Sequence, residues 1–145
     1  MESRRLDEAH GATDRRRRPT ILIADDTTDT RELYAEYFSA RGFAVVTASD
    51  GAQAIQAARD HVPDVIVMDL AMPQFDGITA IRRIKADARA QRARVILLTG
   101  YPHAAVERNA LQAGADRFLT KPCLPEHLER HVNALRRRTR RKAAG

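Results

Sequence analysis

The sequence has no tryptophan, a single cysteine and few aromatic residues, which make up 5% of its 145 residues. One cysteine, Cys123, cannot form an internal disulfide framework, and this scarcity fits a reducing compartment. The sequence also lacks the run of roughly 18 apolar residues that a transmembrane helix needs, and its first residues lack the apolar core of a signal peptide. We therefore expect a cytoplasmic location and no membrane partner. A chain of this length can bury one hydrophobic core.

Acidic residues are missing from the C-terminal end, where positive charge accumulates. The formal net charge is +6; residues 136–145 carry six Lys and Arg without an acid, and residues 1–18 carry six Arg with four acids. The segment between them is therefore slightly acidic. This distribution predicts a disordered basic arm at 1–18, one folded domain at 19–136 and a basic tail at 137–145.

The arginine-rich ends leave a function in nucleic-acid binding open as an alternative. Residues 136–142 could contact phosphates without sequence specificity and with strong salt dependence. Neither end has aromatic residues that could stack on bases, and no helix-turn-helix module follows. A solvated extension of the last helix is the simpler interpretation. The residues do not indicate an oligomeric state.

Five apolar segments alternate with helical patterns between these ends. Strands are expected at 20–24, 43–47, 65–69, 94–98 and 115–120. Helices are expected after each strand: one capped by Thr28 or Asp29 and ended by Gly42, one capped by Asp50 and continuing to Asp60, one from about Ile78, one over 103–113 and one starting at Pro125. This alternation predicts an α/β fold with a doubly wound five-stranded parallel sheet.

Apolar residues at helical spacing indicate which side of each helix faces inward. The predicted inward residues are Leu33, Tyr34, Tyr37 and Phe38 in the first helix, Ile78, Ile81 and Ile84 in the third, and Leu128, Val132 and Leu135 in the last. In the third helix, Arg82, Arg83 and Lys85 are expected to face water.

Chemically active residues occur where four of the five predicted strands end. Asp25 and Asp26 follow the first strand, Asp69 ends the third, Thr99 follows the fourth and Lys121 follows the fifth. Each could be an ordinary turn or surface residue when taken alone. Because the carboxyl ends of parallel strands meet at one edge of a sheet, where ligands bind, we expect these side chains to share one pocket.

The three predicted carboxylates would repel one another unless a cation neutralised them. Oxygen ligands, with no His or Cys at a matching position, favour Mg²⁺ over Zn²⁺. With the metal bound, an ionised Asp69 can act as a nucleophile toward phosphorus. Lys121 and Thr99 can then stabilise the transferred group by charge and hydrogen bonding.

These residues, with the loop Met72-Pro73-x-x-Asp76-Gly77 and the pair Lys121-Pro122, resemble the receiver domain of bacterial two-component response regulators over residues 20–136. The resemblance implies a flavodoxin-like (βα)5 receiver fold acting as a stand-alone phosphorylation switch or relay. Asp69 would accept a phosphoryl group from a sensor histidine kinase or a histidine phosphotransfer protein. Output would come from a downstream effector protein that docks on the fourth helix, fifth strand and fifth helix. The chain would not be an enzyme beyond its own phosphotransfer and autodephosphorylation.

The resemblance also implies a ligand set for Mg²⁺. Asp26, Asp69 and the main-chain carbonyl of Ala71 would bind the metal directly, and Asp25 would act largely through water. Lys121 would pair with the acceptor carboxylate and then with the phosphoryl group, and its peptide bond to Pro122 would be cis.

Thr99 and Phe118 would form the switch. Thr99 would hydrogen-bond a phosphoryl oxygen, and Phe118 would rotate inward as Thr99 moves. Phe118 lacks the hydroxyl group of a tyrosine, so its switching would rest on packing alone. Ala71 lies where many relatives carry a polar side chain, and Tyr101 lies where bulk can shield the acyl phosphate. We therefore expect slow to intermediate self-dephosphorylation.

Two other phosphate-related classes fit the first strand less well. A haloacid-dehalogenase-type enzyme would need a D-x-D pair after it, whereas this sequence has Asp25-Asp26-Thr27. A flavodoxin-like nucleotide binder would need a hydroxyl-rich loop, which Thr27, Thr28 and Thr30 faintly resemble. Asp25 and Asp26 would repel the phosphate of such a cofactor.

Overall fold

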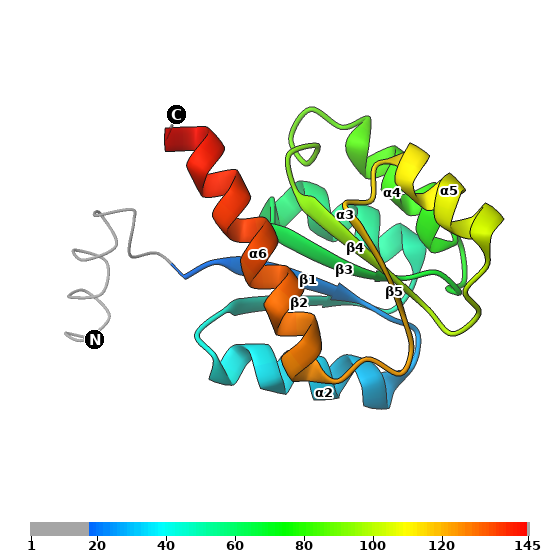
Figure 1. The fold of residues 1–145 in the computed structure, drawn as a ribbon, viewed down its shortest axis with the longest axis horizontal. Helices are drawn as coiled ribbons and strands as arrows, with labels where there is room; N and C mark the ends of the chain where they lie inside the picture. Colours follow the sequence, from blue (N-terminus) through cyan, green and yellow to red (C-terminus); the bar gives the residue numbers. More distant parts are fainter. Residues whose placement is uncertain (1–17, 145) are drawn as a thin grey trace.

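The computed structural model describes residues 18–144, with side chains as far as Arg137, and arranges them around one five-stranded sheet (Figure 1). The strands are β1 (Thr20–Ala24), β2 (Ala44–Ala48), β3 (Val65–Asp69), β4 (Arg94–Thr99) and β5 (Arg117–Thr120). The helices are α2 (Thr28–Ala40), α3 (Gly51–His61), α4 (Gly77–Lys85), α5 (Ala104–Ala113) and α6 (Pro125–Ala144).

The strands lie in the order β2-β1-β3-β4-β5, and all neighbouring pairs are parallel. The chain moves from β1 to one edge at β2, then crosses back to β3 and continues to the other edge. The direction of winding therefore reverses between β1 and β3, which is where ligands bind in open α/β sheets. Helices α2 and α6 cover one face, and α3, α4 and α5 cover the other (Figure 1). The predicted doubly wound α/β fold is confirmed.

Alternate residues of the central strand β3 belong to two hydrophobic cores. Val65 and Val67 pack in the core beneath α2 and α6, whereas Ile66 and Met68 pack in the core beneath α3, α4 and α5. Strand side chains point to opposite faces in turn, so a strand covered on both faces must be apolar throughout. All five residues of β3 are buried. The strand is therefore a fixed support that ends at Asp69.

The observed elements agree with the predicted ones to within two residues at the ends of most strands. β3 has the predicted bounds, while β2 starts at Ala44 rather than at residue 43 and β5 starts at Arg117 rather than at residue 115. Asp50 caps α3 as predicted, because its carboxylate accepts a hydrogen bond from the Gln53 N–H at 2.7 Å. The predicted capping of the first helix is wrong, since α2 begins after Thr27 without a side-chain capping bond.

Two predictions about single side chains are also wrong. Leu33 is 54% exposed, because α2 turns only Tyr34 and Phe38 fully into the core. Lys85 does not simply face water: its ammonium group donates to the carbonyl oxygens of Gln91 at 3.1 Å and Ala93 at 2.6 Å. Lys85 thus ties the end of α4 to the segment that leads into β4.

Helix α6 continues through the basic segment to Ala144, so this segment has the backbone of an extended last helix. Leu128, Val132 and Leu135 are all fully buried, as predicted. The predicted disorder of the N-terminal arm lies outside the described residues, except at Arg18. Among the described residues, no helix combines the length and the apolar character needed to cross a bilayer.

Candidate functional site

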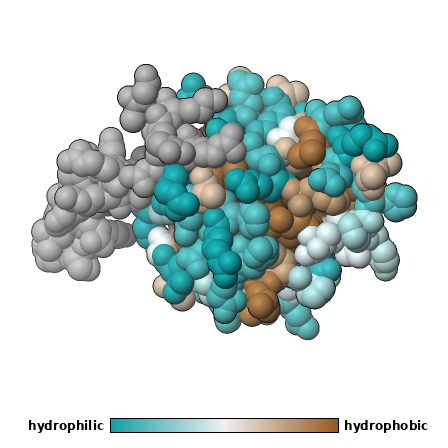
Figure 2. Space-filling model, viewed as in Figure 1, coloured by the Kyte–Doolittle hydropathy of each residue, from teal (hydrophilic) through white to brown (hydrophobic). Residues whose placement is uncertain are grey.

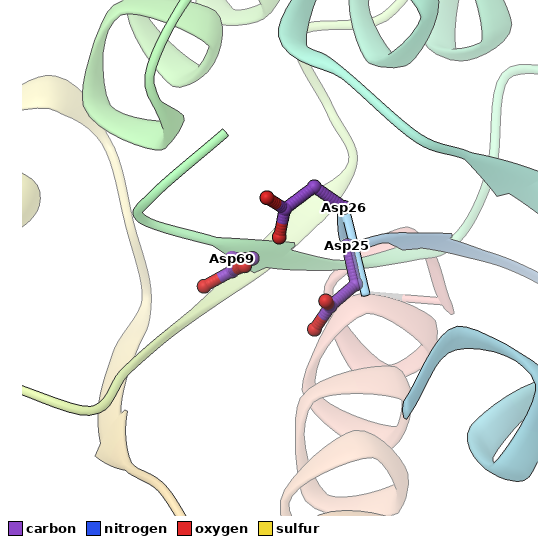
Figure 3. A group of neighbouring side chains, drawn as sticks. All are labelled: Asp25, Asp26 and Asp69. Carbon is purple, nitrogen blue, oxygen red and sulfur yellow. The ribbon is translucent and has the colours of Figure 1, made fainter. Parts of the chain in front are cut away.

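Three carboxylates converge at the edge of the sheet where β1 and β3 end (Figure 3). Asp25 and Asp26 follow the last residue of β1, and Asp69 is the last residue of β3. One oxygen from each lies within 4.8 Å of the others. Asp25 and Asp69 are buried, while Asp26 is exposed and faces solvent from the rim of the site. The predicted acidic cluster therefore exists in three dimensions.

Lys121 reaches this cluster from the end of β5. Its ammonium group donates to Oδ2 of Asp25 at 3.1 Å and lies 3.4 Å from Oδ1 of Asp69. The Lys121 N–H extends the β4–β5 pairing by donating to the Thr99 carbonyl at 2.8 Å. The Tyr34 hydroxyl donates to the Cys123 carbonyl at 2.6 Å and so holds the following loop. The peptide bond between Lys121 and Pro122 is cis, as the resemblance implied.

Burial and like charge leave Asp69 poorly suited to carry a negative charge in the absence of a cation. Burial above all, and then the neighbouring carboxylate of Asp25, raise the pKa of Asp69 from 3.8 to about 6, although Lys121 opposes this shift. Burial alone would lower the pKa of Lys121, but its hydrogen bond to Asp25 and the charge of Asp69 raise it. The ammonium group therefore stays protonated, and its single charge only partly compensates three carboxylates.

The loop after β1 is held by bonds that the sequence did not reveal. The Thr27 N–H donates to Oδ1 of Asp25 at 2.9 Å, so Asp25 closes a short turn on its own loop. Arg31, one turn into α2, donates from its guanidinium to the Asp25 carbonyl at 2.7 Å. Together these bonds fix the position of Asp25. An arginine in the first turn of a helix that follows two acids is the only signal that could have suggested this role.

The loop between β3 and α4 is packed closely against Asp69. The Gly77 N–H donates to the Leu70 carbonyl at 2.8 Å, and a Cβ atom on Gly77 would lie 2.5 Å from the Asp69 carbonyl oxygen. Asp76 caps α4 by accepting from the Thr79 N–H at 2.9 Å. Ala71, predicted to offer its carbonyl to the metal, is exposed in this loop directly beyond Asp69.

Thr99 and Phe118 lie on the two strands beside the cluster. Thr99 is 2% exposed, and its Oγ1 accepts a hydrogen bond from the Tyr101 N–H at 3.0 Å. A hydroxyl group can accept one bond and still donate its own proton. Phe118 is partly buried against the core beneath α3, α4 and α5. Any displacement of Thr99 would therefore be transmitted directly to the loop that precedes α5.

The donor set fits a hard divalent cation. Asp25, Asp26 and Asp69 supply only oxygen atoms, which is the ligand type that Mg²⁺ prefers. Part of the cluster is open to solvent through Asp26, so water can complete the coordination shell, as Mg²⁺ usually requires. Burial, and then the nearby charge of Asp25, raise the pKa of Asp69, and a divalent ion would neutralise the negative charge that these two effects disfavour.

Comparison with known sequences identifies this arrangement. The family described as "Response regulator receiver domain" matches residues 21–133. The chain belongs to this family. Receiver domains are phosphoacceptors of two-component systems and bind Mg²⁺ at an acidic pocket, in agreement with the acidic cluster described above.

Individual relatives support the same assignment. "Chemotaxis protein CheY" of Bacillus subtilis is 37% identical over 115 residues, which cover 78% of this chain and 93% of that protein. "Probable transcriptional regulator ycf27" of Guillardia theta is 35% identical over 123 residues, covering 85% of this chain and 47% of the relative. The chain thus spans about half the length of several curated relatives that it matches.

A solved structure with the same receiver fold was crystallised as the CheX-CheY-BeF3-Mg²⁺ complex from Borrelia burgdorferi. It superposes with a TM-score of 0.75 at 28% sequence identity, over 81% of this chain and 88% of that one.

Proposed function

We propose that this receiver is a phosphorylation-activated switch in which Asp69 accepts a phosphoryl group from a phosphohistidine on a sensor kinase or a phosphotransfer protein. The observation that carries the proposal is the convergence of Lys121 from β5, Asp69 from β3 and the acid pair from β1. Phosphoryl transfer depends mainly on positioning and on neutralising charge. Mg²⁺ held by Asp26, Asp69 and the Ala71 carbonyl, with Asp25 acting through water, would neutralise charge on the carboxylates and on the phosphoryl oxygens.

The protein's own part in the transfer is to hold and orient the nucleophile. A carboxylate oxygen of Asp69 forms a bond to phosphorus while the P–N bond of the donor breaks. The electron pair of that bond stays on the imidazole nitrogen, and the ring leaves as neutral imidazole when its other nitrogen carries a proton. Lys121 already lies 3.4 Å from Asp69 and can pair with the new phosphoryl group. Hydrolysis later returns Asp69 to the carboxylate with release of phosphate.

Thr99 would respond to the new phosphoryl group by forming a hydrogen bond with it. Its hydroxyl group already accepts from the Tyr101 N–H, and its free proton can be donated to a phosphoryl oxygen. Movement of Thr99 toward the site would draw in the segment before α5, and Phe118 would fill the space behind it. This change would bias docking of an effector protein to the surface of α5, β5 and α6.

The direct test is the intact mass of the purified chain after incubation with acetyl phosphate and Mg²⁺. We expect a mass increase of one phosphoryl group on the parent chain and none on the Asp69→Asn variant. Asp76→Asn is a matched control, because it alters an exposed acid in the neighbouring loop and asparagine also caps helices well. Absence of the adduct on the parent chain, or its persistence on Asp69→Asn, would refute the assignment of Asp69.

A further inference from the structure

Hydrophilic residues predominate among the described residues on the face that α6 crosses, and the hydrophobic ones form small groups between them (Figure 2). This pattern does not indicate a second docking surface there. A contact that the phosphoryl chemistry leaves unexplained lies instead between the start of α3 and the loop of residues 70–76. That loop joins β3 to α4 and contains Ala71.

Gly51, the first residue of α3, packs against this loop with no room for a side chain. It is buried, and its N–H donates to the Pro73 carbonyl at 3.1 Å. A Cβ atom on Gly51 would overlap with the carbonyl oxygen of Phe75 and would lie 2.7 Å from both the carbonyl carbon and the Cβ atom of that residue. Because the overlap is with backbone, it cannot be relieved by rotating a flexible side chain. Glycine is therefore needed here for close approach of two backbones.

The loop is also held by its contacts with α4. The guanidinium of Arg83 lies over the Phe75 ring, with Cζ 4.4 Å from the ring centroid. Gln74 has a φ of 72°, so the loop turns sharply just before Phe75. The Gly77 N–H, bonded to the Leu70 carbonyl, closes the far end of the loop. The path of the backbone between β3 and α4 is thus fixed at several points.

A fixed path matters for a metal ligand that comes from the backbone. Ala71 lies two residues after Asp69 and two before Pro73, so a shift of the loop at Pro73 would also move the Ala71 carbonyl. Mg²⁺ demands near-ideal octahedral geometry with ligands at about 2.0–2.1 Å, whereas Ca²⁺ accepts flexible geometry at about 2.3–2.6 Å. A displaced carbonyl should therefore weaken the binding of Mg²⁺ more than that of Ca²⁺.

We propose that Gly51 is a positioning residue of the metal site. Its lack of a side chain lets α3 hold the loop where the Ala71 carbonyl can reach Mg²⁺. Gly51 does not touch the metal and acts through Pro73 and Phe75. The inference rests on the proposed function, in which the Ala71 carbonyl is a ligand. A purely structural role of Gly51 would change stability but not the preference between the two cations.

Titration of the full chain with Mg²⁺ alone, and separately with Ca²⁺ alone, tests this inference without a phosphodonor. Amide NMR spectra of the isotope-labelled protein report both affinities. We expect Gly51→Ala to lower the Mg²⁺ affinity about 10- to 100-fold, as for other disturbed residues behind metal ligands, and the Ca²⁺ affinity by less than about threefold.

Gly100→Ala is the control, because no atom lies within 4 Å of its added Cβ, and both affinities should stay within about twofold of the parent values. Thermal unfolding in EDTA gives the range in which each variant is folded. An equal loss of both affinities in Gly51→Ala would mean that the whole carboxylate cluster is disturbed, and would overturn the inference. A lower Tm with an unchanged Mg²⁺ affinity would overturn it too.

Arg83→Gln tests the same loop without a backbone clash, so it decides the question if Gly51→Ala does not fold. Removing a positive charge should by itself strengthen cation binding, so a lower Mg²⁺ affinity must come from the loop. We expect a fall of about two- to fivefold from loss of the Arg83–Phe75 contact. Arg82→Gln removes the same charge from an exposed neighbour on α4 and should bind Mg²⁺ at least as tightly as the parent. Equal Mg²⁺ affinities of these two variants would contradict the inference.

The outcome is separable from that of the proposed phosphorylation. A parent chain that binds no Mg²⁺ would overturn the positioning role of Gly51. The assignment of Asp69 as phosphoacceptor is decided independently by the mass adduct and its loss in Asp69→Asn.

Discussion

The ammonium group of Lys121 hydrogen-bonds Asp25, with Nζ 3.1 Å from Oδ2, and lies farther from Asp69, at 3.4 Å. The cation that would stabilise a phosphoryl group on Asp69 is therefore engaged mainly by a neighbouring carboxylate before phosphorylation. Asp69 remains partly uncompensated, which agrees with its raised pKa of about 6. A phosphoryl group would supply Lys121 with stronger acceptors and would shift the lysine toward Asp69.

Replacing Asp69 by asparagine should stabilise the metal-free protein at pH 7. The substitution removes a buried charge that Asp25 repels, while Lys121 keeps its bond to Asp25. A shift of about two pKa units corresponds to about 3 kcal/mol at most, so we expect a gain of about 1–3 kcal/mol and a rise in Tm of about 3–8 °C. Thermal unfolding in EDTA measures this change. Mg²⁺ should raise the Tm of the parent more than that of Asp69→Asn; a Tm for Asp69→Asn below that of the parent in EDTA would contradict the prediction.

The stabilising effect of this substitution should depend on pH in a defined direction. The pKa of Asp69 is raised in the folded state, so between about pH 4 and pH 6 the folded protein binds more protons than the unfolded chain. The contribution of this group to stability therefore falls as pH rises through that range and is lowest above about pH 6. The difference in Tm between Asp69→Asn and the parent should grow from pH 5 to pH 7 in EDTA. A constant difference across this range would show that the charge of Asp69 is not its cause.

Gly77→Ala should damage both stability and phosphorylation. The added Cβ atom would lie 2.5 Å from the Asp69 carbonyl oxygen and 2.8 Å from Cδ1 of Leu97, so the end of β3 or the start of α4 must move. We expect a loss of about 1–3 kcal/mol, as for other overpacked sites, measured by urea unfolding. Phosphorylation by acetyl phosphate should slow by at least tenfold. Gly100→Ala is the control, because no atom lies within 4 Å of its added Cβ; similar behaviour of the two variants would contradict this explanation.

Tyr101→Ala should shorten the lifetime of the phosphorylated protein several-fold. The Tyr101 side chain is 84% exposed beside Thr99, where its bulk can limit the approach of water to the acyl phosphate. Its N–H bond to Thr99 comes from the backbone and survives the substitution. Loss of the phosphoryl group, followed by intact mass in the presence of Mg²⁺, measures the lifetime. Tyr101→Phe keeps the bulk and should retain the parent lifetime; a lifetime of only seconds in the parent chain would refute the expected slow hydrolysis.

The fold and the membership of the acidic cluster could be predicted because they depend on patterns that repeat along the chain. β3 is apolar at nearly every position, so its bounds and its terminal Asp69 were evident. Once five parallel strands are expected, their carboxyl ends must meet at one edge, and this brings Lys121 to Asp69 across many residues of sequence.

The hydrogen-bond and ion-pair partners of individual side chains could not be predicted, because they depend on distances between helices, strands and loops. Lys121 could pair with any of three acids, and only the structure reveals that its shorter contact is to Asp25. Arg31 bonds the carbonyl of Asp25, and the sequence does not mark a backbone acceptor; only the position of the arginine after the two acids hints at this contact. Lys85 has the spacing of a solvated residue, but the segment before β4 returns close enough to bind it.

The length of β3 limits how far the charge of a phosphoryl group can act directly. Five residues at about 3.3 Å each put roughly 16 Å between the two edges of the sheet, about twice the distance over which charges are screened at physiological ionic strength. A double negative charge added at Asp69 would therefore have little direct effect at the opposite, amino-terminal edge. A partner that senses phosphorylation must contact the carboxyl-terminal edge itself or an element that moves with it.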